Sequence, residues 1–181
     1  MPSWSKVARR IRVPLGFLFA AVYVWLAHPT VLSMGIAAVF VICGLVIRAA
    51  ASGHVKKNEE LTTSGPYSYT RNPLYLGSII LALGFVIASR SWVVATIALA
   101  FFLAVYVPVI QGEEKYLREH FPDFDEYCSN VPRLLPRIRP HRSIAGSFSR
   151  HLYWKHREYN ASLGAVLMFG ALLAKFLWFA R

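Results

Sequence analysis

Apolar residues fall in five long runs along the chain, separated by polar turns or loops. The runs cover residues 13–27, 31–47, 74–88, 92–110 and 161–180. A transmembrane helix needs about 20 apolar residues, and flanking Trp, Tyr and Arg side chains extend the shorter runs to the membrane interface. One such run could be a buried core helix. Five in 181 residues predict an all-α fold, a polytopic membrane protein with about five transmembrane helices.

Two of the separators are very short. His-Pro-Thr at 28–30 joins the first two runs, and Ser-Arg-Ser at 89–91 joins the third and fourth. Each pair is therefore expected to form an antiparallel hairpin. The N-terminus and the polar segments 49–72 and 111–160 then lie on one side of the membrane, where the two segments can meet beside the open end of the second hairpin.

Positive charge orients this arrangement. Of the 20 Lys and Arg residues, all but Arg90, Lys175 and Arg181 lie in the N-terminus, in the two polar segments or, for Arg48, directly before the first of these segments. Positively charged loops stay in the cytoplasm, so we expect those parts to be cytoplasmic, in a bacterial inner membrane. The net charge of +11 mainly reflects this topology, because anionic lipid headgroups already account for charges beside the spans. Membrane lipids are expected partners, and nucleic acid is not.

Composition supports a surface that faces lipid. The chain is 56% hydrophobic and 16% charged, whereas soluble domains carry about 25% charged residues. The first run has the basic flank of a signal peptide, but no small-residue cleavage site follows it, so we expect it to be retained. Cys43 and Cys128 show no paired or metal-ligand spacing, and neither a disulfide nor a zinc site is supported.

The stretch SGPYSYTRNPLYLGS, residues 64–78, combines a turn with a helix start. Gly65-Pro66 is a turn signal, Asn72 suits the N-cap, and Pro73 suits the first helical position. Its tyrosines, Tyr67, Tyr69 and Tyr75, could form an aromatic belt. Arg71 fits this interpretation poorly, because a cation at a helix N-terminus opposes the macrodipole. A bound carboxylate or phosphate would reverse that argument, so Arg71 is a candidate anion ligand.

Glu113 and Glu114 stand where the fourth run leaves the bilayer. On a solvated helix face, Glu114 could pair with Arg118, and Lys115 with Glu119, because each pair is four residues apart. Glu113 would then have no partner, and burying a carboxylate without a cation is costly. The acidic pair is therefore a candidate functional site.

The chain beyond this helix contains two further segments. Residues 131–143 are too rich in proline for a helix and should form an extended basic strap. Residues 147–160 interleave basic and aromatic side chains, as an interfacial helix does, and membrane anchoring is the main interpretation. We divide the chain into a scaffold hairpin (1–50), a region with the second hairpin and both polar segments (51–140), and an interfacial segment with the last helix (141–181).

Three of these stretches together resemble the isoprenylcysteine carboxyl methyltransferase and phospholipid methyltransferase superfamily of integral membrane enzymes. They are TSGPYSYTRNPLYLG, EEKYLREHF and YCSNVPRLLP, within residues 61–136. The shared pattern is a G-x-Y turn, an R-H-P-x-Y-x-G helix start, an E-E pair and a terminal Y-x-x-x-V-P-R. The resemblance implies S-adenosyl-L-methionine as methyl donor at the cytoplasmic membrane boundary. It implies a small or lipidic acceptor, methylated first on a carboxylate and otherwise on an amine or thiol.

The resemblance also assigns the site. The catalytic positions are Arg71, Glu113 and Glu114. The cofactor-binding positions are Leu61, Thr62, Tyr67, Asn72, Pro73, Leu74, Tyr75 and Glu113. The donor's carboxylate would meet Arg71, its ammonium or ribose hydroxyls would meet Glu113 or Glu114, and an aromatic face could attract the sulfonium. Because the donor is already activated, catalysis needs mainly alignment and exclusion of water.

Two positions depart from the family pattern. Asn72 stands where the family usually has histidine, and Val109 stands where eukaryotic prenylcysteine methyltransferases have an arginine that contacts the substrate carboxylate. Two other functions stay open. One is that of the membrane sterol and steroid reductases, which bind NADPH at a comparable R-H-P-x-Y site. The other is a non-enzymatic membrane scaffold.

Overall fold

The structure is a computed structural model that describes residues 4–56, 59–141 and 146–179. Over these residues it contains helices and no strand, which confirms the all-α prediction. The elements are α1 (Trp4–Leu26), α2 (Val31–Ser52), the 3-10 helix η1 (Gly65–Ser68), α3 (Pro73–Ser89), α4 (Trp92–Phe101), the π-helix η2 (Phe102–Tyr106), α5 (Val107–His120), α6 (Phe124–Asn130), α7 (Arg150–Lys155) and α8 (Tyr159–Phe179).

Each of the five apolar runs lies in a helix, up to the last described residue of the fifth run. Among the described residues, three helices are long and apolar enough to cross a membrane: Val31–Ser52, the continuous helix Trp92–His120, and Tyr159–Phe179. The apolar parts of the other two, Pro14–Leu26 and Pro73–Ser89, are shorter than 18 residues. The first helix begins at Trp4, well before the predicted start, because the basic residues ahead of the apolar run continue the same helix.

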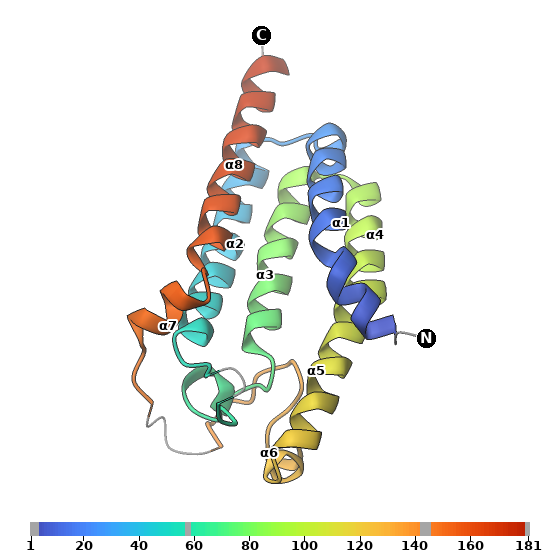
Figure 1. Ribbon diagram of the computed structural model, residues 1–181. Helices are drawn as coiled ribbons and strands as arrows, with labels where there is room; N and C mark the ends of the chain where they lie inside the picture. The colour runs from blue at the N-terminus through green and yellow to red at the C-terminus, as the bar shows by residue number, and fades with distance from the viewer. Residues whose placement is uncertain (1–3, 57–58, 142–145, 180–181) are drawn as a thin grey trace.

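The long helices run side by side, and the polar segments gather at one end of the bundle (Figure 1). The α1–α2 and α3–α4 turns lie at the opposite end, where the backbone N–H of His28 donates to the carbonyl of Ser89 at 2.8 Å. The chain after α2, the 3-10 helix η1, and helices α6 and α7 share the other end. The two polar segments therefore meet beside the second hairpin, as predicted.

The closest helix packing differs from the predicted hairpins. Helix α3 packs far more extensively on α2 than on α4, although a long loop joins α2 to α3. Gly44 and Gly77 permit this approach, because a Cβ on Gly44 would lie 2.6 Å from the carbonyl oxygen of Gly77. Small residues at such contacts let helix backbones approach closely, and van der Waals packing then stabilises the pair within lipid.

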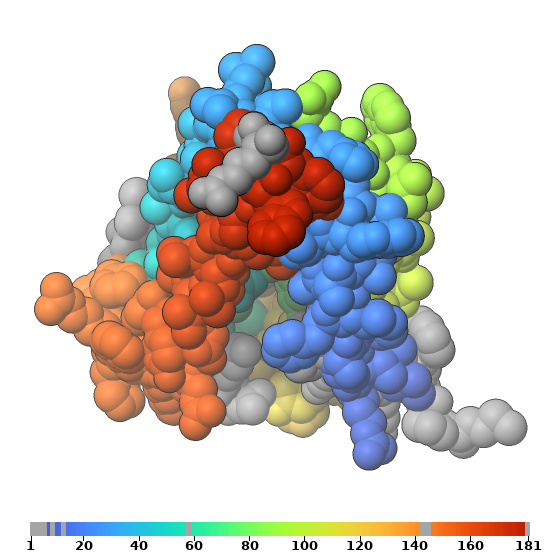
Figure 2. Space-filling view, turned by 90° about the horizontal axis from the view of Figure 1, so that it is seen from above, coloured from blue at the N-terminus to red at the C-terminus, as the bar shows by residue number. Residues whose placement is uncertain are grey.

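The last helix, α8, is hydrogen-bonded to the end of α1. Near its end, the Lys175 ammonium donates to the carbonyls of Val24 and Trp25 at 2.8 and 2.7 Å, which satisfies unpaired acceptors at the C-terminus of α1. Seen from the end where α8 finishes, α8 lies beside α1 and α7 projects from the side (Figure 2). Many large apolar side chains of the helices stay exposed, including Phe17, Val39 and Leu167, as a lipid-facing surface requires.

A π-helical turn, η2, interrupts the helix that connects α4 to α5. Pro108 follows it, and in a regular α-helix the proline ring clashes with the carbonyl four residues earlier and supplies no N–H. The wider turn relieves this clash. π-turns inside helices are frequent at functional sites, and this one places Tyr106 in a cavity described below.

The proline-rich strap contains no helix over residues 131–141, as predicted, and its backbone bends at several positions; Arg142 and Ser143 lie outside the described residues. It runs against η1 and the start of α3. The N–H groups of Arg137 and His141 donate to the carbonyls of Tyr69 and Ser68, and the N–H of Arg71 donates to the carbonyl of Pro132. The strap therefore holds the turn before α3 in place. The predicted interfacial helix is only the short α7, followed by a turn into α8.

Candidate functional site

A cavity of about 820 Å³ opens among the polar segments at the end of the bundle that carries η1 and α6. Four parts of the chain line it: the end of α2 with the following loop, the η1–α3 segment, the η2–α5 helix with α6, and the turn between α7 and α8. Its lining residues are Arg48, Ser52, Val55, Lys56, Glu60, Leu61, Thr62, Tyr67, Arg71, Asn72, Leu74, Tyr75, Ser78, Tyr106, Glu113, Glu114, Tyr116, Leu117, Phe124, Tyr127, His156 and Glu158.

The fold brings the predicted site residues together around this cavity. All of them line it except Pro73, which is buried behind it at the first turn of α3. Residues 61–75 supply one wall, and Glu113 and Glu114 supply another from α5. The predicted residues therefore share one cavity, and their surroundings within it differ.

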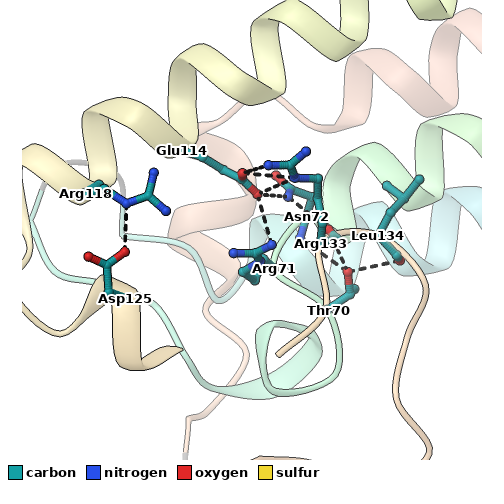
Figure 3. Close-up of polar contacts among 8 residues, drawn as sticks. All are labelled: Thr70, Arg71, Asn72, Glu114, Arg118, Asp125, Arg133 and Leu134. Atoms are coloured by element: carbon teal, nitrogen blue, oxygen red, sulfur yellow. Dashed lines mark hydrogen bonds and ion pairs between the residues drawn. The ribbon is translucent and has the colours of Figure 1, made fainter. Parts of the chain in front are cut away.

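Glu114 is the buried centre of a polar network (Figure 3). Its Oε2 accepts hydrogen bonds from Arg133 Nη2 at 2.6 Å and Nε at 3.0 Å. Its Oε1 accepts from Asn72 Nδ2 at 3.3 Å and lies 3.7 Å from Arg71 Nη2. Only 6% of the Glu114 side chain is exposed. Both carboxylate oxygens are thus already engaged, and they join α5, the strap and the start of α3.

One local prediction is wrong, and a second is confirmed only in part. Arg118 does not pair with Glu114; its Nε donates instead to Asp125 Oδ1 at 2.7 Å (Figure 3). Asn72 occupies the N-cap position of α3, but its side chain makes no capping hydrogen bond. Its Nδ2 donates to the carbonyl of Arg133 at 2.9 Å as well as to Glu114. The Asn72 side chain therefore binds the strap and Glu114 instead of the N–H groups at the start of α3. The predicted Lys115–Glu119 pair is present at 3.9 Å.

Arg71 has an incompletely satisfied guanidinium. Its side chain is only 13% exposed and lines the cavity. Its Nε is buried and has no hydrogen-bond partner in the described part of the chain. Buried N–H donors are normally satisfied, so an unpaired one in a cavity wall indicates a place for an acceptor. Neighbouring Glu114 is saturated by other donors, which leaves this nitrogen for a ligand.

Glu113 differs from Glu114 in its hydrogen bonding. It lines the same cavity and is half-buried, yet it forms no hydrogen bond or ion pair with the residues that the structure describes. The cavity therefore presents one carboxylate and one guanidinium nitrogen without partners among the described residues. Together they could bind a ligand that carries both a positive and a negative charge.

Aromatic side chains form much of the remaining wall. Tyr67 and Tyr75 are buried, which contradicts the interpretation of these two residues as an aromatic belt at the membrane surface. The Tyr127 hydroxyl donates to the carbonyl of Tyr67 at 2.6 Å. Burial raises the pKa of the Tyr67 hydroxyl and of the Tyr127 hydroxyl, so both stay protonated at physiological pH. The rings of Tyr75 and Tyr106 meet edge to face at 5.8 Å.

Sequence reasoning missed the residues that close the cavity from α2, from α3 and from the turn between α7 and α8. These are Arg48, Ser52, Ser78, His156 and Glu158. The signal for Arg48 was a charge at the end of an apolar run, where an ionisable residue is a candidate functional group. His156 and Glu158 had no signal, because their surroundings match a membrane-anchoring segment. No group of three or more His, Cys, Asp or Glu among residues 4–56, 59–141 and 146–179 could hold a metal ion.

The family model for phospholipid methyltransferases matches residues 11–123, more than half of the chain. The chain belongs to the phospholipid methyltransferase family. Family membership and the apolar helices make it an integral membrane protein of a methyltransferase family, and the predicted superfamily is confirmed. All the predicted site residues lie inside the matched region; Arg133, His156 and Glu158 lie beyond it. No solved structure matches the chain.

Two bacterial proteins are similar to about half of this chain. The nickel-cobalt-cadmium resistance protein NccN of Alcaligenes xylosoxydans xylosoxydans is 36% identical over 103 residues, which are 54% of this chain and 48% of NccN. The cobalt-zinc-cadmium resistance protein CzcN of Cupriavidus metallidurans is 42% identical over 88 residues, which are 48% of this chain and 40% of CzcN. The chain therefore spans less than half the length of each relative.

Proposed function

We propose that this member of the phospholipid methyltransferase family uses S-adenosyl-L-methionine to methylate a small or lipidic acceptor at the cavity between η1–α3 and α5. One observation carries the proposal. The cavity wall offers a buried Arg71 Nε without a described partner and a Glu113 carboxylate without one. The amino-acid end of the proposed donor carries the matching charges, a carboxylate and an ammonium.

Each charge of the donor then has a partner of opposite sign. A carboxylate near Arg71 would also lie near the N-terminus of α3, where the partial positive charge of the helix dipole favours anions. Glu113 would accept hydrogen bonds from the ammonium. Charge-assisted hydrogen bonds of this kind contribute about 1.5–3 kcal/mol each, which is enough to orient a small ligand.

The aromatic wall suits the rest of the donor. Tyr67, Tyr75 and Tyr106 present ring faces or edges to the cavity, and a sulfonium near an aromatic face is attracted by the ring quadrupole. Leu61 and Leu74 add apolar surface for a nucleoside. The donor supplies an activated methyl group. The residues of the chain would bind it, orient it and exclude water from the nucleophile.

The volume and the position of the cavity suit a two-substrate reaction. At about 820 Å³ the cavity is near the upper end of the range of about 300–1,000 Å³ seen for ligand pockets, so a donor and part of an acceptor can share it. It lies where helices with exposed apolar surfaces end. An acceptor with an apolar tail could keep that tail in the membrane, with the site on the cytoplasmic side.

Ligand binding to the detergent-purified protein tests this proposal. We expect S-adenosylhomocysteine to bind, and Arg71→Ala and Glu113→Gln each to weaken it by about 10- to 100-fold, the effect of one charge-assisted hydrogen bond. Arg118→Ala is the matched control, because Arg118 pairs with Asp125 and does not line the cavity. Thermal unfolding of each variant shows that it is folded.

Three outcomes would contradict the proposal. Tight NADPH binding without S-adenosylhomocysteine binding would favour the reductase function. Binding of neither compound would favour a scaffold. If the folded Arg71→Ala and Glu113→Gln variants bind S-adenosylhomocysteine like the wild type, then the assignment of the two charges to the donor is wrong.

A further inference from the structure

One end of the cavity lies outside the donor site and is closed by the C-terminal arm, which we define as residues 149–179. The arm contributes His156 and Glu158 to the cavity wall. His156 contacts Ser52 of α2, and Glu158 contacts Arg48 of α2, which also contacts Ser78 of α3. The match to the family model stops at residue 123, so the arm is an addition to the matched region. The polar groups at this end would not contact a donor bound at Arg71 and Glu113.

An ion pair fixes the arm to α2. Arg48 Nε donates to Glu158 Oε1 at 2.6 Å and Nη2 donates to Oε2 at 3.1 Å, so the pair is bidentate. Arg48 Nη1 donates to the hydroxyl of Ser78 and to the carbonyl of Leu74. The Glu158 side chain is only 9% exposed. Arg48 is therefore neutralised, and it offers little attraction to a further anion at this end of the cavity.

Backbone geometry brings His156 to the same place. Arg157 has a positive φ of 53°, a conformation that residues other than glycine rarely adopt, and it turns the chain between α7 and α8. The N–H of Ser149 also donates to the carbonyl of Gly53 at 2.9 Å, which ties the start of the arm to the end of α2. His156 is thus held against α2 from both sides.

The hydrogen bond of His156 identifies its tautomer. Its Nδ1 lies 3.1 Å from the carbonyl oxygen of Ser52. A carbonyl can only accept, so Nδ1 carries the hydrogen, and in the neutral ring Nε2 keeps a lone pair. No hydrogen bond or ion pair involves Nε2 among the described residues, and His156 lines the cavity. The ring is therefore oriented like a general base whose other nitrogen is fixed by the backbone.

We propose that this end of the cavity is the methyl-acceptor subsite, and that His156 Nε2 removes the proton of a protic nucleophile: an amine, a thiol or a hydroxyl. The inference rests on the proposed methyltransferase function. The nucleophile's lone pair forms the bond to the methyl carbon, and the electrons of the broken carbon–sulfur bond stay on sulfur. The proton passes from the nucleophile to Nε2.

The charges around His156 disfavour a carboxylate acceptor at this end. Such an acceptor has no proton to lose and needs a free cation, whereas Arg48 is already bound by Glu158. Two lysines of this region belong to pairs as well. Lys155 on α7 pairs with Glu59 at 3.2 Å, and Lys56 pairs with Glu60 at 3.1 Å. The subsite is thus close to neutral, which suits an uncharged nucleophile with an apolar tail.

Methyl transfer to three probes that share one apolar tail tests the subsite: dodecylamine, dodecanethiol and dodecanoic acid. We expect the amine or the thiol to be methylated in preference to the acid. His156→Asn keeps an amide N–H for Ser52 but removes the Nε2 lone pair. It should lower the rate by about 100-fold or more, the usual contribution of a general base.

Two further measurements separate a catalytic role from a structural one. His156→Asn should bind S-adenosylhomocysteine like the wild type. Nitrogen NMR of histidine-labelled protein should show a neutral His156 ring protonated at Nδ1, with an Nε2 signal that shifts when dodecanethiol and S-adenosylhomocysteine are added. His151→Asn is the matched control, because His151 is exposed on the same short helix and does not line the cavity.

The proposal is overturned if dodecanoic acid is the preferred probe, if no probe is methylated by protein that binds S-adenosylhomocysteine, or if the neutral ring is protonated at Nε2. It is also overturned if His156→Asn keeps the wild-type rate. Failure of the wild type to bind S-adenosylhomocysteine is a different result, which would overturn the proposed methyltransferase function itself.

Discussion

Glu113 and Glu114 are neighbours in the sequence, and yet their surroundings differ completely. Successive residues of a helix point about 100° apart, so one carboxylate reaches the strap while the other stays in the cavity. Glu114 is bound by Arg133 and Asn72, and Glu113 has no partner among the described residues. Two identical side chains can therefore have separate roles, one in stability and one in ligand binding.

Glu114→Gln should destabilise the protein, because it leaves the largely buried guanidinium of Arg71 without a countercharge. Breaking a buried ion pair by removing one partner costs about 3–5 kcal/mol, and the half-exposed Arg133 places the expected loss near the lower value. Thermal unfolding in detergent measures the change. Glu113→Gln is the control and should unfold near the wild-type temperature. Equal destabilisation by both substitutions would contradict the separate roles.

Helices α2 and α3 form the pair on which the cavity depends. Arg48 extends from α2 across the face of Gly77 to reach Ser78, and the two backbones approach most closely at Gly44 and Gly77. This packing brings the first turn of α3, which carries the candidate donor site, beside the end of α2.

Gly77→Ala should separate α2 from α3. The added Cβ would lie 2.7 Å from Arg48 Cγ and 2.8 Å from the Gly44 carbonyl oxygen, and the backbone there cannot yield cheaply. Overpacking costs typically about 1–3 kcal/mol, and we expect a lower unfolding temperature with weaker S-adenosylhomocysteine binding. Gly35→Ala on α2 is the control, because nothing lies within 4 Å of its Cβ. A Gly77→Ala protein as stable as Gly35→Ala would show that close approach is not required.

The whole molecule has two unlike ends. One end carries the cavity and most of the charge, and the other carries the two tight turns and few polar groups. Helix α8 and the turn before it connect them, through Glu158 with Arg48 at the cavity end and through Lys175 with the end of α1 at the other. These contacts give the last helix a structural role.

The charge asymmetry predicts that the cavity end faces the cytoplasm. Cys128 lies on α6 at this end and is half-buried. In a Cys43→Ser background, a membrane-impermeant maleimide should label Cys128 only after the inner membrane is opened. Arg90→Cys, in a chain that lacks both native cysteines, is the control and should be labelled in intact spheroplasts. Labelling of Cys128 in intact spheroplasts would reverse the predicted topology.

The positions of the helices were predictable because they depend on local features. Run length, the turn chemistry of Gly65-Pro66 and the fit of Pro73 to a first helical turn act over a few residues. The resemblance to the methyltransferase superfamily also predicted which residues form the site. Of these, Arg71, Tyr67 and Glu113 line one cavity. The start of α1 was missed because the helix continues through the basic residues ahead of the apolar run. The missing cap hydrogen bond of Asn72 was not predicted because its side chain binds Glu114 and Arg133, which are distant in the sequence.

The sequence by itself determined an all-helical membrane protein with its charge at one end and its candidate donor site at the start of α3. Only the tertiary structure decided which groups of that site are free. Arg133 reaches Glu114 across 19 residues, and Arg48 reaches Glu158 across 110. Contacts between such distant positions depend on how the helices pack, and no local pattern encodes them. They leave Arg71 Nε and Glu113 without described partners, and they bring His156 to the cavity.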